Sequence, residues 1–407
     1  MTGYICLKSN PMKINSCQFN DSYFPIMDGV GMTVHNYADW LNSKYGESVV
    51  VVPKVKGYRD VADYKVYRFK SMLLPGMNPY RVGLPFVDVS FKKNLKKQKI
   101  DIAHAHCPFI SGQIALKLAR KNGIPLVTTF HTKYREDFKR MVSNEPLLDY
   151  LVDYSMEFYK KADHVWVPNN ATGMTLREYG YTGEYEVMAN GCDIEIPDKH
   201  QLMKMRKKGL EESGAGKDDF VLLFVGQHRW EKNVRMIIEA LKQLKSTGED
   251  FFMIFVGEGY AQKEMKNMVK QLELDDRVHF AGVITDRTRL LNYYAAADLF
   301  LFPSLYDNSP LVIQEAAAFG LPSIVVKNSS AAEPVIDGVN GFIVGNDPEF
   351  LARQIHTLMF KPQVVKKAGQ GAQKSLYHPW ESIADEVYFR YKDIIKEFRK
   401  KKKSSTK

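Results

Sequence analysis

Short apolar runs alternate with amphipathic stretches along most of this chain, and the alternation forms two series. Strand-length apolar runs of the first series occupy residues 48–53, 102–105, 126–130, 164–168 and 186–188. The intervening segments 110–122 and 146–161 repeat their apolar positions with a helical period. Strands that alternate with helices in this way are typical of a parallel sheet covered by helices.

A second series of the same kind begins at residue 220. Its predicted strands are 220–225, 251–256, 278–281, 298–302, 323–326 and 342–344. Its predicted helices are 234–246, 261–272, 310–319 and 347–360. The charged segment 203–219, which contains Gly214 and Gly216, lies between the two series and is interpreted as a connector.

Two halves of similar length predict an α/β protein with two doubly wound parallel-sheet domains, 12–197 and 198–377, facing a central cleft. Ligands of such sheets bind outside the carboxyl ends of the strands, so the loops after the strands are the expected sites. Residues 378–407 are predicted to form a C-terminal helix with a basic tail, and the residues before Met12 an extension.

Composition excludes several classes of protein. Of the 407 residues, 45% are apolar and 12% aromatic, which fits a globular chain rather than a disordered one. The cysteines at 6, 17, 107 and 192 form no C-x-x-C pair, so neither a disulfide framework nor a zinc knuckle is predicted. No apolar run reaches about 18 residues, and the N-terminus lacks the apolar core of a signal peptide. We therefore expect a reduced, cytoplasmic chain.

The formal net charge of +10 is concentrated in two segments. Nine basic and two acidic residues lie in 390–407, and five lysines without an acid lie in 92–99. Apolar residues at helical spacing (Tyr391, Ile394, Ile395 and Phe398) accompany the first segment and favour an anionic membrane as partner. A solvated tail, or docking of this stripe on the protein itself, are the alternatives. No nucleic-acid-binding motif accompanies the charge, so nucleic acid is not an expected partner.

Two loops after predicted strands carry candidate chemistry. The loop 226–233 (GQHRWEKN) combines a glycine with basic residues before a helix, as phosphate-binding loops do. Before the helix at 310–319, Asp307 is followed by Ser309, the expected N-cap, and by Pro310 at the first helical position. A diphosphate at this helix start would meet free N–H groups, while Asp307 and Glu315 accept hydrogen bonds from sugar hydroxyls. An ordinary loop and solvated caps are the alternatives.

The order and spacing of these blocks resemble glycosyltransferase family 4, whose members are retaining enzymes with two Rossmann-like domains in the GT-B arrangement. The resemblance is carried by ADLFLFPSLYDNSPLVIQEAAAFGLPSIV, VGQHRWEKN, FVGEG, VHFAGV and DGVNGFIV in the second half, and by DIAHAHCPF, TTFHTKY and VMANGCD in the first. It spans about Met12 to Trp380. It implies an acceptor-side first domain, a nucleotide-sugar-binding second domain and a C-terminal helix that crosses back to the first.

The resemblance assigns donor-binding roles in the second half. Glu315 matches the second glutamate of the family's E-x(7)-E segment, expected on the ribose hydroxyls, and Asp307 replaces the first, expected on the donor sugar. Lys232 matches the basic residue that neutralises the diphosphate. Gln227 replaces an arginine of the family, and Arg229 is the candidate to supply the missing charge. The remaining donor-binding candidates are Gly226, Asn308, Ser309, Pro310 and Leu311.

In the first half, Gly29 and Gly31 resemble the glycine-rich loop after the first strand, which approaches the diphosphate or the acceptor. His131 matches the family's active-site histidine near the donor sugar, and a structural histidine is the alternative. The resemblance makes His131, Lys232 and Asp307 the predicted catalytic residues and places His106 on the acceptor side.

The implied reaction transfers a hexose, from a UDP-sugar by family habit, to a hydroxyl of a lipid or glycan acceptor with retention of configuration. Same-face displacement assisted by the leaving phosphate is the expected route. The chain contains no Asp-x-Asp triplet, so we expect neither a metal nor a cofactor.

The blocks HCPF and FHTKY and the basic tail resemble lipid-directed members such as diacylglycerol glucosyltransferases. They imply a peripheral protein on the inner face of the cell membrane. A soluble or polysaccharide acceptor, or a non-catalytic lipid- or polymer-binding role, stays open. A dinucleotide-dependent oxidoreductase is disfavoured, because FNDSYFPIMDGVGM lacks G-x-G-x-x-G.

Overall fold

The computed structural model describes residues 12–26, 28–73, 81–139 and 142–404, which form two compact units. The first unit contains the described residues up to Pro168, the segment Thr172–Ala189 and the chain from Trp380 onward. The second unit contains Asn169–Ala171 and Asn190–Pro379. The extension expected before Met12 lies outside the described residues.

The main sheet of the first unit is parallel, with strand order β3-β2-β1-β6-β7-β8-β9. The strands are β1 (Ser16–Phe19), β2 (Ser48–Pro53), β3 (Lys65–Phe69), β6 (Ile102–Ala105), β7 (Leu126–Thr129), β8 (His164–Val167) and β9 (Glu186–Val187). The order reverses between the neighbours β1 and β6, so the loops after these strands flank the topological switch point. A separate antiparallel ribbon pairs β4 (Ser71–Leu73) with β5 (Arg81–Gly83).

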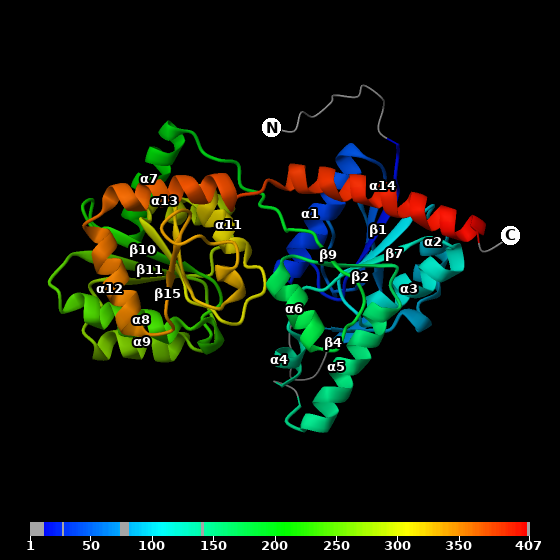
Figure 1. Ribbon diagram of the computed structural model, residues 1–407, viewed down its shortest axis with the longest axis horizontal. Coiled ribbons are helices and arrows are strands. Elements are labelled where there is room, and N and C mark those ends of the chain that lie inside the picture. The colour runs from blue at the N-terminus through cyan, green and yellow to red at the C-terminus, as the bar shows by residue number, and fades with distance from the viewer. Residues whose placement is uncertain (1–11, 27, 74–80, 140–141, 405–407) are drawn as a thin grey trace. The chain divides into compact units, whose positions relative to one another are not determined.

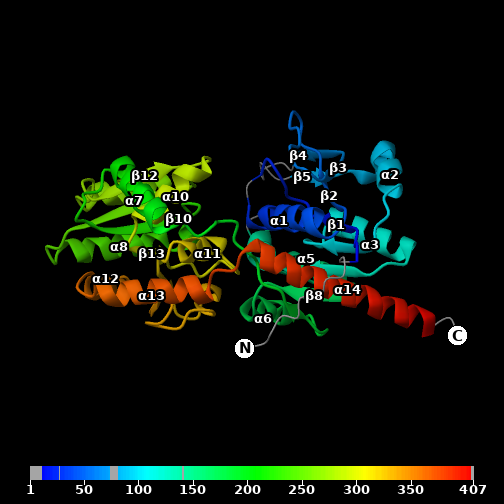
Figure 2. The same cartoon turned by 90° about the horizontal axis from the view of Figure 1, so that it is seen from above.

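Helices cover both faces of this sheet (Figures 1 and 2). On one face, α1 (Gly29–Lys44) packs beside α14 (Trp380–Ser404), and Tyr37, Trp166 and Tyr391 belong to their shared buried cluster. The other face is covered by α2 (Val89–Lys96), α3 (Ile110–Asn122), α5 (Glu145–Lys160) and α6 (Asn170–Glu178). The short elements η1 (Pro85–Val87) and α4 (Tyr134–Lys139) complete the unit.

The second unit has a parallel sheet of its own, with strand order β12-β11-β10-β13-β14-β15. The strands are β10 (Phe220–Val225), β11 (Phe251–Val256), β12 (Val278–Gly282), β13 (Leu299–Phe302), β14 (Ser323–Val326) and β15 (Phe342–Val344). Here the order reverses at β10, whose neighbours are β11 and β13. The loops after β10 and β13 therefore meet at the edge where such sheets bind ligands.

Helices also cover both faces of the second sheet, with α8 and α9 below it and α7 and α13 above it in Figure 1. The lower group is α8 (Val234–Lys245), α9 (Gln262–Gln271) and α12 (Pro348–Met359). The upper group is α7 (Lys199–Ser213), α10 (Arg287–Ala296), α11 (Leu311–Ala318) and α13 (Pro362–Ser375). Two short turns are η2 (Trp230–Lys232) and η3 (Ser330–Ala332).

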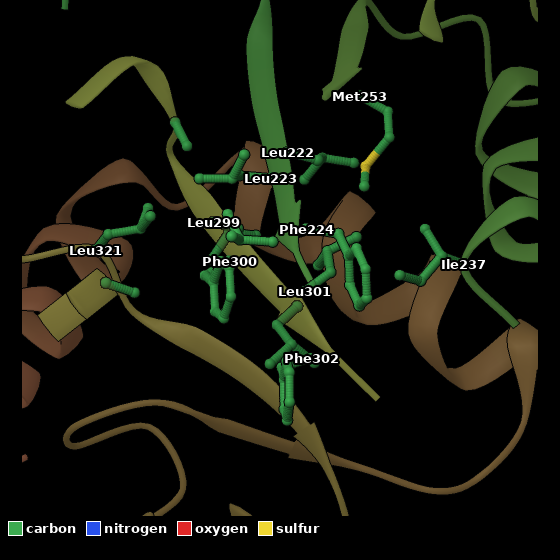
Figure 3. Close-up of a cluster of buried hydrophobic side chains, with 14 of the residues drawn as sticks. Leu222, Leu223, Phe224, Ile237, Met253, Leu299, Phe300, Leu301, Phe302 and Leu321 are labelled. Atoms are coloured by element: carbon green, nitrogen blue, oxygen red, sulfur yellow. The ribbon is translucent and has the colours of Figure 1, made fainter. Parts of the chain in front are cut away.

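The central strands β10 and β13 of the second unit are buried on both faces, and Figure 3 shows side chains of both strands. Successive side chains such as Leu222, Leu223 and Phe224 point to opposite sides and pack under both helix layers. The predicted fold class, two doubly wound parallel-sheet halves, is confirmed by these two sheets.

Residues 203–213 of the charged segment interpreted as a connector instead belong to a helix. Helix α7 begins with a capping box in which Asp198 and Gln201 exchange hydrogen bonds, and it ends at Gly214, which has a φ of 81°. Gly209 faces α10, where an added Cβ would lie 2.2 Å from the carbonyl oxygen of Asn292. The charged helix α7 packs on α10 at Gly209. The sequence did not predict this contact, because a glycine in a polar segment is also typical of a connector.

The apolar stripe near the C-terminus docks on the protein. Tyr391, Ile394 and Ile395 are between 0% and 2% exposed and pack in the cluster over the sheet of the first unit. The stripe is therefore not a membrane-facing surface, whereas the basic residues 399–403 at the end of α14 are exposed. Within the described part of the chain, no helix combines the length and the apolar character needed to cross a bilayer.

Candidate active site

Lys232 and Asp307 form an ion pair at the carboxyl edge of the second sheet. Lys232 ends η2 in the loop after β10, and Asp307 lies in the loop after β13. Ser304 Oγ donates to Asp307 Oδ2 over 2.6 Å and so orients the carboxylate. The Lys232 and Asp307 side chains remain 15% and 18% exposed. A ligand at this edge would find a fixed cation beside a carboxylate that still has lone pairs to accept hydroxyl groups.

The helix that follows Asp307 begins one residue later than predicted. Pro310, with a ψ of 114°, is the N-cap of α11, and Leu311 is its first residue. Ser309 is therefore not the N-cap, because the extended backbone of Pro310 delays the first helical turn. The amides of Leu311 and Val312 lie at the positive end of the α11 dipole, whereas the amide of Ile313 already donates to the carbonyl of Pro310 over 3.2 Å. Asn308, three residues before Leu311, is 9% exposed, and its carbonyl accepts a hydrogen bond from Asn169.

Glu315 is held in one orientation by two neighbours that the sequence did not reveal. Arg287 Nη1 contacts Glu315 Oε1 at 3.0 Å, and the Tyr294 hydroxyl donates to Oε2 over 2.6 Å. Both partners come from α10, and Arg287 also pairs with Asp193 at 2.6 Å. Glu315 is 12% exposed at its side chain, so it is fixed but still accessible to a small polar group.

The loop 226–229 packs directly against the turn after β11. An added Cβ at Gly257, where φ is 122°, would lie 2.1 Å from the carbonyl oxygen of Gly226. At Gly259 it would lie 2.3 Å from the carbonyl oxygen of His228. The FVGEG motif is therefore required by the close approach of two loops.

Arg229, the candidate for the missing charge, lies beside the loop after β13. Its guanidinium group lies 5.9 Å from the centre of the Tyr306 ring and donates to Gln227 Oε1 over 3.2 Å. It also pairs with Glu231 at 3.3 Å. Gln227 itself is exposed. Arg229 and Lys232 thus approach consecutive residues, Tyr306 and Asp307.

His228, between Gln227 and Arg229, is a buried aromatic residue rather than a charged one. Its ring is 0% exposed and lies near Phe224, Phe255 and Phe280. Neither ring nitrogen has a hydrogen-bond partner among the described residues. Burial lowers the pKa of His228 to about 4, so at neutral pH it adds no charge to this loop.

In the first unit, His106 and His131 contact each other at the edge of the sheet. His106 directly follows β6 and His131 lies two residues after β7, the neighbouring strand. His106 Nδ1 lies 3.0 Å from His131 Nε2, and His106 Nε2 lies 3.0 Å from Gln18 Oε1 on β1. His106 is 1% exposed and both of its ring nitrogens are engaged. Both ring nitrogens of His106 are therefore bound within the first unit, and its acceptor-side role stays a prediction.

Burial keeps these rings uncharged. It lowers the pKa of His131 to about 3 and the pKa of His106 well below its usual value. Because a neutral imidazole has one donor and one acceptor nitrogen, one of the two rings donates and the other accepts in the contact between His106 Nδ1 and His131 Nε2.

The glycine-rich loop forms the start of α1. Asp28 is the N-cap, and its Oδ1 accepts a hydrogen bond of 2.7 Å from the amide of Gly31. An added Cβ at Gly31 would lie 3.2 Å from that oxygen, whereas at Gly29 it would meet nothing within 4 Å. Gly31 is thus constrained by its own cap, and Gly29 borders open space.

Two family matches together span both units. Residues 27–196 match the family described as Glycosyltransferase Family 4, and residues 205–375 match the family described as Glycosyl transferases group 1. The chain is 24% identical over 398 residues to the alpha-monoglucosyldiacylglycerol synthase of Acholeplasma laidlawii, which covers 94% of this chain and 98% of the relative. It is 25% identical over 356 residues to the synthase of the same name from Streptococcus pneumoniae (strain ATCC BAA-255 / R6). That alignment covers 85% of this chain and 78% of the relative.

Solved structures agree in fold. Sucrose-phosphate synthase from Thermosynechococcus elongatus superposes with a TM-score of 0.77 at 20% identity, over 95% of this chain and 100% of that one. Anabaena HepE in complex with UDP superposes with a TM-score of 0.72 at 21% identity. The superposition covers 94% of this chain and 100% of HepE. These matches confirm the resemblance seen in the sequence motifs. The chain belongs to glycosyltransferase family 4 and is a hexosyltransferase built from two Rossmann-like domains of the GT-B fold.

Proposed function

We propose that the protein transfers a glucosyl residue from UDP-glucose to a hydroxyl of diacylglycerol or a related glycerolipid, with retention of configuration. The proposed acceptor rests on the near full-length similarity to a synthase named for monoglucosyldiacylglycerol. A complex of the structural neighbour HepE with UDP-glucose supports the donor.

The second unit supplies the groups for a nucleotide diphosphate. Lys232, with Arg229 beside it, and the amides at the start of α11 would neutralise the charge that develops on the leaving phosphate. Asp307, oriented by Ser304, would accept hydrogen bonds from the sugar, and Glu315, oriented by Arg287, from the ribose. Gly226, Gln227, Asn308, Ser309 and Pro310 would border the donor.

Retention is proposed to follow from attack on the face that the phosphate leaves. The bond from the anomeric carbon to the phosphate oxygen breaks as the bond to the acceptor oxygen forms, and the acceptor proton passes to the departing phosphate. Positive groups around that phosphate would then stabilise the negative charge that it gains as the sugar departs. Lys232 and the α11 amides can do this without a metal ion.

The assignment is tested with purified protein, UDP-glucose and diacylglycerol in mixed micelles that contain an anionic lipid. We expect a monoglucosyl product by mass spectrometry and an α-anomer by NMR. Glycan and water-soluble acceptors are assayed in parallel. Turnover confined to these acceptors would contradict the lipid proposal, and a β-anomer would contradict retention.

Substituting Glu315 by glutamine is expected to raise the KM for UDP-glucose about 10-fold with a smaller change in kcat. The amide keeps the side-chain length but removes the charge that Arg287 pairs with, and the ribose is remote from the bond that breaks. Steady-state kinetics over a range of UDP-glucose concentrations measures the split. An equal loss in kcat would place Glu315 in the reacting part of the site instead.

The five lysines of 92–99 are proposed to contact anionic lipid, together with the exposed tail of α14. They are exposed on or just after α2, near the exposed residues Phe86, Val87 and Val89. Replacing Lys92, Lys93, Lys96 and Lys97 by glutamine should weaken binding to anionic vesicles at least about tenfold, at roughly 1 kcal/mol per lysine. Added salt should have the same effect.

The matched control replaces four exposed lysines of the second unit, Lys204, Lys207, Lys208 and Lys217, by glutamine. It changes the net charge by the same amount. Vesicle sedimentation compares the two quadruple variants. Equal weakening in both would show that total charge, and not the 92–99 segment, governs binding.

A further inference from the structure

We infer that Asn233 is a positioning residue for the transfer reaction, because its side chain connects the loop that carries Lys232 to the loop that carries Asp307. The inference rests on the proposed function of Lys232 and Asp307 at the donor. All of the groups involved belong to the second unit. Asn233 itself is not proposed to contact the donor.

Asn233 has a backbone conformation in which glycine is the usual residue. Its φ is 59° and its ψ is 31°, in the left-handed region. Its amide donates to the carbonyl of Trp230 over 2.8 Å and closes η2, and its carbonyl accepts from the amide of Met236 over 3.1 Å in the first turn of α8. The chain therefore turns from η2 into α8 at this residue. A glycine would adopt this turn more readily, so the asparagine side chain needs a separate explanation.

The side chain of Asn233 connects three loops at the carboxyl edge of the sheet. Its Nδ2 donates to the carbonyl of Pro303 over 3.3 Å and to Oδ1 of Asn346 over 2.8 Å. Pro303 begins the loop after β13, and Asn346 lies in the loop after β15. A weaker contact joins Nδ2 to the sulfur of Met236 at 3.3 Å. Because the carbonyl of Pro303 can only accept, the nitrogen of the Asn233 amide must face it.

These bonds connect the backbone segments that carry the Lys232–Asp307 ion pair. Lys232 directly precedes Asn233, and its side chain is 15% exposed beside Asp307. Ser304 directly follows Pro303, is 0% exposed, and donates to Asp307 Oδ2 over 2.6 Å. The Asn233 amide thus fixes the backbone next to the cation relative to the serine that orients the carboxylate. A cation stabilises developing charge best when its position is fixed before the reaction.

Substituting Asn233 by glycine removes the amide and keeps the backbone conformation. We expect kcat/KM for UDP-glucose to fall about 10-fold, mainly through kcat, because a displaced Lys232 stabilises the leaving phosphate less well. The melting temperature should change by no more than about 2 °C, because glycine adopts this left-handed conformation without steric cost. A residue that only supports the fold would not lose activity while stability is kept.

A second variant and a matched control separate the side chain from the backbone. Asn233→Ala also lacks the amide but places a Cβ in the left-handed conformation, so it should match Asn233→Gly in kcat/KM and melt at a lower temperature. The control is Asn328→Gly, because Asn328 is an exposed asparagine of the second unit with a φ of 66°. This substitution should leave kcat/KM unchanged. An equal fall of kcat/KM in Asn328→Gly and Asn233→Gly would overturn the inference.

Hydrogen exchange followed by mass spectrometry gives a readout that is independent of turnover. Asn233→Gly should speed amide exchange in segments 226–233 and 303–309, whereas Asn328→Gly should not. Unchanged exchange in both segments, or wild-type kcat/KM in Asn233→Gly, would overturn the inference. Full activity of Lys232→Ala would instead contradict the proposed donor site, and the exchange rates would still decide whether Asn233 holds the two loops together.

Discussion

Replacing Lys232 by alanine is expected to lower kcat/KM for UDP-glucose about 100- to 1000-fold. A fixed donor or cation aimed at charge that develops in the transition state is worth about this much. Lys232 lies in the loop after β10, beside Asp307, and its side chain is 15% exposed. The leaving diphosphate is proposed to lie at this position. Most of the loss should fall on kcat, because the negative charge on the phosphate grows as the sugar departs. Steady-state kinetics with UDP-glucose and the lipid acceptor measures both parameters.

Two controls make this result specific. Lys242→Ala removes an exposed lysine from α8 in the same unit and should leave kcat/KM unchanged. Lys232→Arg keeps the charge and should retain part of the activity, because a guanidinium group can also contact a phosphate. Thermal melting of each variant checks the fold, since Lys232→Ala leaves Asp307 without its cation. Near wild-type turnover in a folded Lys232→Ala protein would contradict the proposed donor site.

Replacing Tyr391 by alanine is expected to reduce the free energy of unfolding of the first unit by about 3–5 kcal/mol. Truncation of a buried aromatic side chain removes its transfer free energy and leaves a cavity. Tyr391 is 1% exposed, and its ring stacks on Trp166 with centroids 5.6 Å apart. Its hydroxyl also bonds His104, so the variant leaves that buried nitrogen without this partner.

The neighbouring Phe389 gives a matched control for this measurement. It is also an aromatic residue of α14 but is 55% exposed, so Phe389→Ala should change stability by less than about 1 kcal/mol. Urea unfolding followed by tryptophan fluorescence suits the comparison, because Trp40, Trp166 and Trp380 all lie in the first unit. Equal destabilisation by the two substitutions would show that α14 does not dock through Tyr391.

Local patterns predicted the strands of the second unit well, whereas β3, β4 and β5 of the first unit were not predicted. Continuous apolar runs such as 220–225 and 251–256 correspond to strands buried on both faces, and apolar periodicity has few alternative explanations there. The predicted positions of helix ends were less accurate. The Ser309–Pro310 pair has the composition of a cap followed by a first turn, yet the extended backbone of Pro310 starts α11 at Leu311.

Contacts between distant residues could not be predicted. The sequence suggested separate roles for Lys232 and Asp307, but not that the two would pair across neighbouring loops. Arg287 and Tyr294 carry no motif and matter only because α10 and α11 cover the same face of the sheet. The amphipathic stripe of α14 was compatible with a membrane or with the protein, because periodicity gives the apolar face of a helix but not its partner.

The placement of α14 has a consequence for the order in which the chain is made. The sheet face that includes Ile102, Val127 and Trp166 is covered by residues from Trp380 onward, and Gln18 finds Tyr391 at a separation of 373 residues. A ribosome must synthesise the whole second unit before that cover emerges, which takes on the order of ten seconds at typical elongation rates. We therefore expect the second unit to complete its folding first. During that interval the first unit exposes an apolar sheet face, and it is the half of the nascent protein that most needs a chaperone.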